Sequence, residues 1–371
     1  MSATASQQDD RIHLSEQEAR EAMIGILARA GYASDEQLLI ANHLLDAALC
    51  GYDYSGFPKL QDLIGHAKAK LPRKPATTVH ETPVSALIDG GNTVGMVTVD
   101  RATDDLIARA SQQGFAVVGV FNSWMTGRSA YYVERIARAG LIGFHTASTF
   151  PIVAPPGGAA PALGTNPIAF SFPKTGDPLV IDMSTSAISF TEMGLLERTG
   201  GQLPENVAID KRGRPTRDPA AAKAGALLNF AGYRGFAVSL TVLACGVMAG
   251  AAKSPNRDYG YLLVAMRPDL LTPLDTYRKD LEETLARIKA TPTMEGIGEI
   301  RIPSERAFRE RRRRQKDGFE VDRKIWDALQ AIGKKDRAKP PNNLRPPAPN
   351  IRLKIRAVFS GMRLATRCPP Q

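Results

Sequence analysis

The spacing of apolar residues predicts three helices within the first 70 residues. Ser15-Glu16-Gln17-Glu18 is a capping-box pattern ahead of the first helix, which Gly31 ends. Ser34-Asp35-Glu36-Gln37 repeats the pattern and opens a second helix that continues to about Cys50. A third helical run covers roughly residues 57–70. The N-terminal part of the chain is therefore predicted to be helical.

From Val84 onward the pattern changes to alternating strands and helices. Short apolar runs bounded by turn residues predict strands, and the longer periodic runs between them predict helices. The predicted strands are Val84–Ile88, Phe115–Val120, Leu141–Thr146, Ile168–Phe172, Leu179–Ile181 and Tyr261–Met266. The predicted helices are Arg101–Gln113, a helix after the polar loop Asn122–Ser129 that ends near Gly140, Tyr233–Ala252 and Pro273–Ala290. Asp89-Gly90-Gly91-Asn92 is predicted as a turn, and the whole region as α/β.

The helix predicted over residues 233–252 is mostly apolar. Leu240, Leu243, Ala244, Val247 and Met248 recur along it at the spacing of a core face. The arginine-rich run Arg309–Arg314 is interpreted as a solvated helix face, with a phosphate site as the alternative.

Residues 141–186 combine two strand-like runs with a long stretch of small, turn-forming and hydroxyl residues. Pro155-Pro156-Gly157-Gly158 and Gly164-Thr165-Asn166-Pro167 precede the two strands. Glycine permits close approach of the backbone to a ligand, and proline fixes the turns that present it. Because strands interrupt the stretch, it is interpreted as a packed site loop and not as a disordered segment.

The net charge of +10 is concentrated in the tail. Residues 335–371 contain nine Lys or Arg and one Asp, which leaves about +2 for the preceding 334 residues. This distribution argues against nucleic-acid binding as the main function. The tail is also rich in proline, so we expect it to be disordered.

No apolar run reaches the roughly 18–20 residues needed to span a bilayer, so no membrane association is expected. The N-terminus lacks the apolar core of a signal peptide. Cys50, Cys245 and Cys368 are widely spaced and form no metal or redox motif, which suits a reducing cytoplasm. A cytoplasmic protein without a metal site is predicted.

The chain lacks the usual nucleotide-binding fingerprints. Gly296-Ile297-Gly298 is followed by Glu299-Ile300-Arg301, with no third glycine, and no P-loop is present. A dinucleotide would need a binding mode other than that of a Rossmann domain.

Several ordered motifs resemble those of the malate/L-lactate dehydrogenase family of NAD(P)-dependent oxidoreductases, the non-Rossmann type that also includes cyclic-imine (pyrroline- and piperideine-2-carboxylate) reductases. The motifs are Gly164–Ala169, Asp182–Ser186, Ala208–Asp210 with Gly213–Pro219, and Gly232–Phe236. Each motif is weak alone, and their order and spacing carry the resemblance over roughly residues 12–334.

The resemblance implies an α/β fold with an open, largely antiparallel cofactor-binding sheet and a helical domain built from both chain ends. It also implies an intertwined homodimer and a small-molecule substrate. The expected parts are an N-terminal helical part (1–75), a cofactor- and substrate-binding α/β domain (76–255), a C-terminal part that returns to the helical domain (256–334) and the basic tail (335–371).

The resemblance also assigns binding residues. Thr165 and Asn166 are expected in the substrate pocket, and NAD or NADP is expected at Val180, Ile181, Asp182, Met183, Ser184, Tyr233, Arg234, Ser304, Glu305 and Arg306. Arg234 and Arg306 have the guanidinium geometry that favours phosphate. Without the family pattern, Asp182-Met183-Ser184 would be interpreted first as an ordinary helix cap after a strand.

The chain departs from the family at the proton donor. The family carries Ser-His-Gly and, three positions later, an Arg that holds the substrate carboxylate. Here Ser55 stands in place of the His and Lys59 in place of the Arg, while Met125 replaces a second family His. The candidate catalytic residues are therefore Ser55, Tyr54 and Glu192, with Lys59 as a substrate contact.

Three functions remain open at this stage. A cyclic imine substrate arrives protonated and needs mainly hydride, so the missing His would matter little. A 2-oxo or 2-hydroxy acid dehydrogenase would instead use Glu192 or a tyrosine as the acid. The third alternative is a dimeric, non-catalytic protein that binds the cofactor. His43, in the second helix, is expected on a polar face and not in catalysis.

Overall fold

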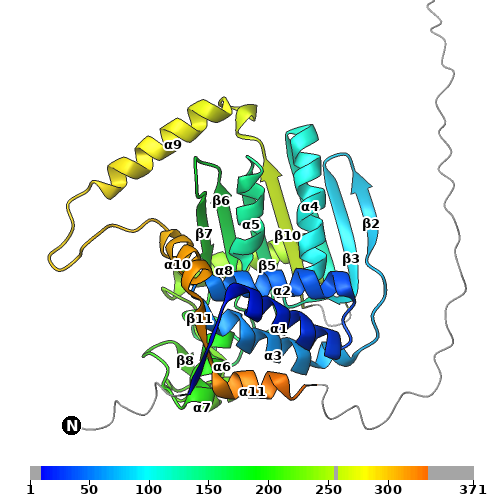
Figure 1. Ribbon diagram of the computed structural model, residues 1–371, viewed down its shortest axis with the longest axis vertical. Coiled ribbons are helices and arrows are strands. Elements are labelled where there is room, and N and C mark those ends of the chain that lie inside the picture. The colour runs from blue at the N-terminus through cyan, green and yellow to red at the C-terminus, as the bar shows by residue number, and fades with distance from the viewer. Residues whose placement is uncertain (1–9, 255–257, 333–371) are drawn as a thin grey trace, which may run out of the picture. The chain divides into compact units, whose positions relative to one another are not determined.

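The computed structural model describes residues 10–254 and 258–332, all within one compact unit, Met1–Lys334 (Figure 1). The predicted disordered tail, 335–371, lies outside the described residues. Among the described residues no helix is long and apolar enough to cross a membrane. The domain boundaries expected from the sequence at residues 75 and 255 stay predictions.

Seven strands of the described chain form one sheet in the order β2-β3-β4-β10-β5-β6-β7. The pair β3–β4 is parallel and every other neighbouring pair is antiparallel. Their bounds are β2 Thr77–Thr82, β3 Ser85–Val94, β4 Phe115–Trp124, β5 Ile142–Ser148, β6 Ile168–Phe172, β7 Leu179–Met183 and β10 Gly260–Met266. The expected open, largely antiparallel sheet is confirmed.

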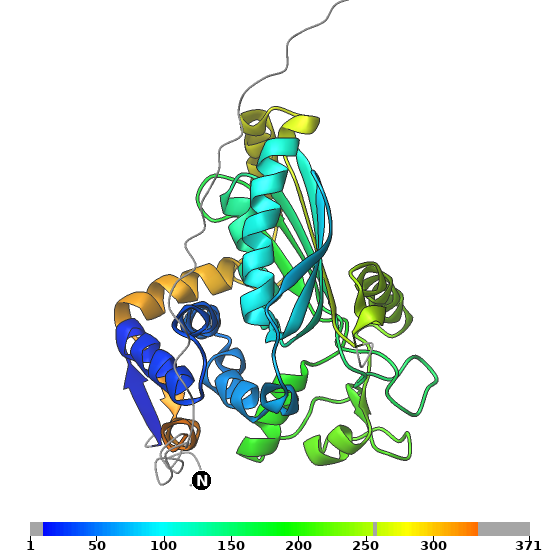
Figure 2. The same ribbon diagram turned by 90° about the vertical axis from the view of Figure 1, so that its right-hand side faces the viewer.

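Helices cover both faces of this sheet (Figure 2). Helices α4 (Gly95–Gln113) and α5 (Ser129–Arg138) pack on one face, and α8 (Tyr233–Met248) contacts β5 and β10 from the other. The apolar side chains of α5 that point to the sheet, Tyr132, Val133 and Ile136, are fully buried.

The helical part contains segments from both chain ends, as the family resemblance implies. Strand β1 (Arg11–Leu14) pairs antiparallel with β11 (Phe319–Asp322), which ties the two ends together. Around them lie α1 Glu16–Arg29, α2 Ser34–Leu49, α3 Phe57–Gly65, α10 Glu305–Asp317 and α11 Arg323–Gln330 (Figure 1). The remaining elements are α6 Phe190–Thr199, α7 Pro219–Ala224, β8 Ala208–Ile209, β9 Ala226–Leu227, α9 Leu274–Lys289 and the 3₁₀ turns η1 Asp53–Ser55, η2 Ala67–Lys70, η3 Ala251–Lys253 and η4 Pro268–Leu270.

The first helix begins as its sequence predicts. The backbone N–H of Glu18 donates to Ser15 Oγ at 3.3 Å, and the Glu18 carboxylate accepts from the Ser15 N–H at 2.8 Å. The second helix begins one residue earlier than its pattern indicates, with Ala33 as the N-cap and Glu36 accepting from its N–H at 3.3 Å.

The predicted turn at Asp89–Asn92 is part of a longer strand. β3 continues to Val94 through an irregular register, and α4 begins at Gly95 instead of Arg101. Asp89 Oδ1 accepts from the Gly91 N–H at 2.9 Å, so the polar residues stabilise a bulge without ending the strand. In α4 the buried Thr98 hydroxyl is satisfied by Ser123 Oγ at 2.6 Å, which permits a polar residue on a core face.

The predicted core face of α8 is wrong. Leu240, Leu243, Val247 and Met248 are 43, 39, 58 and 66% exposed, and together they form what we call the outward face of α8. The buried positions are Gly235, Ser239, Val242 and Gly246. A Cβ at Gly246 would collide with Ser148 Oγ, so the close approach of α8 to β5 requires small residues. The larger apolar side chains therefore point outward.

The arginine-rich helix α10 is a solvated face only in part: Arg309, Arg312 and Arg313 are exposed, whereas Arg311 and Arg314 are largely buried. Arg311 makes two 2.7 Å hydrogen bonds to Glu134 on α5 and an ion pair of 2.8 Å with Asp46 on α2. Arg314 donates to the Ala48 carbonyl at 2.9 Å. These contacts bind α10 to the helices of the opposite chain end.

Candidate active site

The main cavity has a volume of about 800 Å³ and lies where the helical part meets the sheet. Its walls come from η1 and α3, the loop between β4 and α5, the segment after β5, the end of β7, and the start of α6. Tyr54, Ser55, Lys59, Thr165 and Asp182 all line this cavity. Sequence positions more than 120 residues apart are thus brought together.

The turn that carries Ser55 is positioned by a glycine. A Cβ at Gly56 would lie 2.9 Å from the Ala48 Cβ, so only glycine permits this approach to α2. Pro58 then occupies the first turn of α3, where its missing N–H costs no hydrogen bond. As a result Lys59 also lies in the first turn of α3, beside the cavity.

Lys59 is held by a single neutral contact. Its Nζ donates to Thr191 Oγ1 on α6 at 3.0 Å, and no described carboxylate lies within ion-pair distance. Burial lowers the pKa of the Lys59 ammonium, and Asp62 opposes this only in part. Asp62 itself pairs with Arg198 at 3.3 Å.

Tyr54 holds its proton strongly. Burial raises the pKa of the Tyr54 phenol to about 12, and the nearby Glu192, Tyr52 and Asp182 contribute in the same direction. Glu192 does not line the cavity. It lies in the first turn of α6, where its N–H donates to Ser189 Oγ at 3.0 Å.

The end of β7 contributes the polar groups expected for a cofactor. Asp182 Oδ2 accepts from the Ala130 N–H at 2.8 Å, at the N-terminus of α5, where a carboxylate is favoured. Burial raises the pKa of the Asp182 carboxyl, and this hydrogen bond opposes the shift. Ser184 Oγ donates to the Thr165 carbonyl at 3.0 Å, and Met183 also lines the cavity. Within β7, Val180 is buried and Ile181 is half-buried.

Asn166 is fully buried and does not line the cavity. Its Nδ2 donates to Ser239 Oγ at 3.0 Å, and its Oδ1 accepts from the Thr149 N–H at 3.1 Å. Thr149 does line the cavity, so the structure gives Asn166 a positioning contact.

Sequence reasoning missed Arg128, which lines the main cavity. Gly127, at φ +75°, turns the chain so that the Arg128 N–H donates to Nε2 of the buried His43 at 2.8 Å. A Cβ at Gly127 would collide with that imidazole. The only signal in the sequence was the polar loop Asn122–Ser129, which marked a site without indicating its residue.

The Arg128 guanidinium is held in place by an ion pair and by an aromatic ring. Nη2 pairs with Asp46 at 2.5 Å, and the group lies 5.2 Å over the Tyr52 ring. Burial alone would lower the pKa of this guanidinium, but Asp46 and the Cys50 thiol raise it above its ordinary value. Arg128 is therefore a permanent cation. His43, expected on a polar face, is instead buried and holds this loop.

His66 is a second cavity residue that the sequence did not indicate. Its ring stacks on Trp124 with centroids 4.6 Å apart, and its Nδ1 accepts from the Lys68 N–H at 3.2 Å. This hydrogen bond leaves the neutral ring with its proton on Nε2. Burial, Lys68 and Lys59 lower the pKa of His66.

The other predicted cofactor residues lie apart from the main cavity. Tyr233, 73% exposed, and Arg234 stand at the start of α8 on the opposite face of the sheet. Arg306 lies 5.0 Å over the Tyr52 ring, at the edge of the main cavity. Ser304, at φ +67°, is the N-cap of α10, and Glu305 lines a second cavity.

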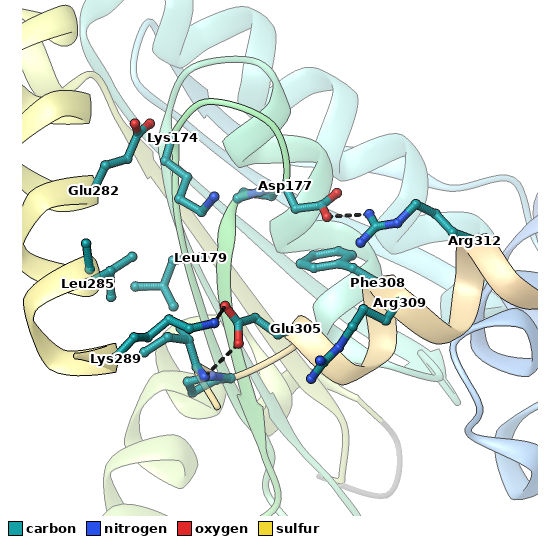
Figure 3. A pocket seen from close by; sticks show the side chains of 14 residues that line it. Lys174, Asp177, Leu179, Glu282, Leu285, Lys289, Glu305, Phe308, Arg309 and Arg312 are labelled. Atoms are coloured by element: carbon teal, nitrogen blue, oxygen red, sulfur yellow. Dashed lines mark hydrogen bonds and ion pairs between the residues drawn. The ribbon is translucent and has the colours of Figure 1, made fainter. Parts of the chain in front are cut away.

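The second cavity, of about 420 Å³, lies between α9, the start of β7 and α10 (Figure 3). Its floor is apolar, from Leu179, Leu285 and Phe308. Glu305 pairs with Lys289 at 2.6 Å and accepts from the Ile302 N–H at 3.1 Å. Within residues 10–254 and 258–332, no group of three His, Cys, Asp or Glu side chains could hold a metal ion.

Comparison with known proteins agrees with this geometry. The sequence profile of the malate/L-lactate dehydrogenase family matches residues 14–330. An L-sulfolactate dehydrogenase from Methanothermobacter thermautotrophicus is 31% identical over 323 residues, which cover 83% of this chain and 93% of the relative. A ureidoglycolate dehydrogenase (NAD(+)) from Escherichia coli O157:H7 is 29% identical over 318 residues, 82% of this chain and 90% of the relative.

The fold comparison agrees as well. The crystal structure of a delta1-piperideine-2-carboxylate reductase from Pseudomonas syringae has a TM-score of 0.73 at 25% identity, covering 86% of this chain and 99% of that one. The fold is that of an oxidoreductase outside the Rossmann class, in a family whose members are NAD(P)-dependent. The chain belongs to the malate/L-lactate dehydrogenase family.

Proposed function

We propose that the chain transfers a hydride between NAD or NADP and a small 2-oxo acid, 2-hydroxy acid or cyclic imine carboxylate in the main cavity. One observation carries this proposal: Asp182, Met183 and Ser184 line the same cavity as Ser55 and Lys59. The cavity volume is in the range of small-molecule sites. The names of the relatives cover substrates of this kind, namely sulfolactate, ureidoglycolate and piperideine-2-carboxylate.

The surroundings of β7 fit a dinucleotide. β7 is the last strand of the described sheet, so its outer edge offers backbone hydrogen-bonding groups. It extends from Leu179 at the second cavity to Met183 at the main cavity, which provides one pocket for each half of an extended cofactor. Asp182 and Ser184 would bind ribose hydroxyls, with Val180 and Ile181 along the path and Ser304 and Glu305 near the second cavity. Arg306, over the Tyr52 ring, would lie at the edge of the main cavity. When bound, the reduced nicotinamide supplies the hydride.

The chain's own residues then bind the substrate and handle its proton. Lys59 and Thr165 line the cavity as substrate contacts, with Asn166 holding the wall behind them. Tyr54 and Ser55, with Glu192 next to Tyr54, are the proton-handling groups that the family pattern suggests. Serine is not an acid near neutral pH, so Ser55 supports a substrate that arrives protonated or a donor elsewhere in the cavity.

A homodimer is part of the proposal. The outward face of α8 is apolar and exposed, and a second copy of the chain would bury it. Tyr233 and Arg234 begin the same helix, so in such a dimer they would border the partner's surface and reach a cofactor only there. The cytoplasmic location stays a prediction.

Replacing Asp182 with alanine is expected to weaken NADH binding at least tenfold, equivalent to about 1.4 kcal/mol, because a ribose hydroxyl loses a charged acceptor. The measurement is calorimetric titration with NADH and with NADPH. Asp269→Ala, which removes a surface carboxylate paired with Arg267 away from both cavities, is the control. Equal affinity of wild type and Asp182→Ala would contradict this cofactor site.

A second function is favoured by one observation, the serine at the position of the family's proton donor. In that case the chain is a dimeric cofactor-binding protein that no longer catalyses. Calorimetry would then give the cofactor affinity expected of the active enzyme, and no substrate would be turned over.

A further inference from the structure

Two cationic side chains of the main cavity, Lys59 and Arg128, are held in opposite ways. Arg128 is locked by Asp46 and by the Tyr52 ring, whereas Lys59 has only the Thr191 hydroxyl as a partner. The family pattern would give Lys59 the substrate carboxylate and would give Arg128 no role. We propose instead that Arg128 binds the substrate carboxylate and that Lys59 donates the proton. This inference rests on the proposed function, because both roles belong to the same reaction.

Arg128 has free donors on a fixed frame. Its side chain is 9% exposed and lines the cavity, and its Nε is buried without a partner among the described residues. Only Nη2 is engaged, with Asp46 Oδ2 and the Cys50 thiol. Nη1 has no partner among the described residues, so its N–H groups can donate charge-assisted hydrogen bonds to a carboxylate in the cavity.

Two carboxylates stabilise the charge of Arg128: Asp46, which pairs with it, and the cavity residue Asp182. Arg128 ends an alternating series of ion pairs that we call the arginine–carboxylate chain. The chain consists of Arg128, Asp46, Arg311, Glu134, Arg138, Asp177 and Arg312, each paired with the next. Four arginines and three carboxylates leave one positive charge in excess within this chain, and Asp182 is a further carboxylate near its cavity end.

Lys59 is suited to proton transfer because its ammonium is not neutralised. It donates one hydrogen bond to Thr191, which leaves its other N–H groups for a ligand. The charged and titratable groups around it are Asp62 and His66 on its own side of the cavity, Arg198 on α6 and His43 on α2. Asp62 pairs with Arg198, and no described carboxylate lies within ion-pair distance of Lys59 Nζ.

The other cavity groups are poorer donors. The Tyr54 phenol, with a pKa of about 12, keeps its proton near neutral pH. The Nδ1 of His66 accepts from Lys68, so this ring stays neutral and can offer only a hydrogen bond from Nε2. Glu192 does not line the cavity.

The proposed step balances as follows. A hydride adds to C2 of a 2-oxo acid and forms a C–H bond, while the π electrons of the C=O bond move to the oxygen. That oxygen takes a proton from the Lys59 ammonium and becomes a hydroxyl. The acid is reduced by two electrons, the dihydronicotinamide is oxidised by two, and the neutral Lys59 amine regains a proton from water. A cyclic iminium arrives protonated and needs no proton from Lys59.

The proposal predicts a pH dependence with a definite sign. Reduction requires protonated Lys59, so kcat/KM is constant at low pH and falls as pH rises through a pKa that burial has lowered. Oxidation of the 2-hydroxy acid requires the neutral amine and rises with pH over the same range. Lys59→Met should remove both the fall of the reduction rate and the rise of the oxidation rate with pH.

The test uses the full chain with NADH, pyruvate and oxaloacetate as 2-oxo acids, and pyrroline-2-carboxylate as the imine. Lys59→Met and Lys59→Arg should each lower kcat for the 2-oxo acids about 10²–10⁴-fold, the usual contribution of a positioned acid. Both should leave NADH affinity and imine reduction unchanged. Arginine keeps the charge and cannot give up a proton, so it separates donation from anchoring. Lys70→Met is the control.

The proposed role of Arg128 is tested by calorimetric titration of oxamate, a 2-oxo acid analogue, into the NADH complex. Arg128→Lys keeps a cation for Asp46 and loses the second nitrogen that faces the ligand, so oxamate should bind at least about tenfold more weakly and KM should rise more than kcat falls. Arg101→Lys, on an exposed ion pair with Asp35, is the control.

The outcomes separate this inference from the proposed function. If wild type turns over no substrate of the panel, the proposed function and the Lys59 role both fail, while the oxamate titration still decides the role of Arg128. If wild type reduces 2-oxo acids and Lys59→Arg retains the rate, Lys59 is a carboxylate anchor and the inference is wrong. A wild type that reduces only the imine also overturns the Lys59 role. Unchanged oxamate affinity in Arg128→Lys overturns the proposed role of Arg128 in binding the carboxylate.

Discussion

Replacing Arg311 with methionine is expected to lower the free energy of unfolding by about 3 kcal/mol, near the lower end for breaking a buried ion pair. Arg311 joins α10 to α5 and α2 through Glu134 and Asp46, and all three side chains are largely buried. Methionine would fill much of the same space, so the loss comes from the two carboxylates. Glu134 would still pair with Arg138 and Asp46 with Arg128, which is why the expected cost is not larger.

The measurement is equilibrium unfolding in urea. Arg313→Met is a matched control on the same helix, because Arg313 pairs with Glu310 at the surface and should contribute at most about 1 kcal/mol. If the two variants unfold at the same urea concentration, α10 is not held by the arginine–carboxylate chain.

Replacing Leu243 and Val247 together with glutamate is expected to convert a dimer into a monomer. Both residues belong to the outward face of α8, and in a symmetric dimer each is buried twice. Burial of one such side chain contributes about 1.5–3 kcal/mol, so the dimer dissociation constant should rise by at least about 10³-fold.

Sedimentation or light scattering across a concentration series measures this change. Leu38→Glu is the control, since Leu38 is an exposed leucine on another helix, α2. A wild type that is already monomeric at high concentration would contradict the homodimer. A dimer that survives both glutamates would contradict the interface at α8, since the contact would then lie elsewhere.

Local sequence signals predicted the elements that depend on neighbouring residues. The capping box at Ser15 and the strands Ile168–Phe172 and Leu179–Met183 are where the pattern places them. The pairing of β1 with β11 escaped prediction because it joins residues about 310 positions apart. The outward face of α8 was assigned to a core because apolar spacing cannot tell which side meets another surface. There the small residues Gly235 and Gly246 were the informative ones.

The site was predictable where it depended on motifs and not where it depended on packing. The structure brings Asp182, Thr165, Ser55 and Lys59 together in one cavity, and their roles there stay predictions. Arg128 was invisible because its importance comes from Asp46 and Tyr52, which are close in space and distant in sequence. His66 was hidden at the end of a predicted helix that in fact stops at Gly65.

The central claim is that this cavity reduces small 2-oxo acids or cyclic imine carboxylates with a nicotinamide cofactor. The most direct measurement is the disappearance of NADH or NADPH with each member of a panel of 2-oxo acids and with pyrroline-2-carboxylate. The account predicts turnover of at least one of them, and its loss when Asp182 is replaced by alanine at subsaturating cofactor. Tight cofactor binding without turnover of any compound would contradict it.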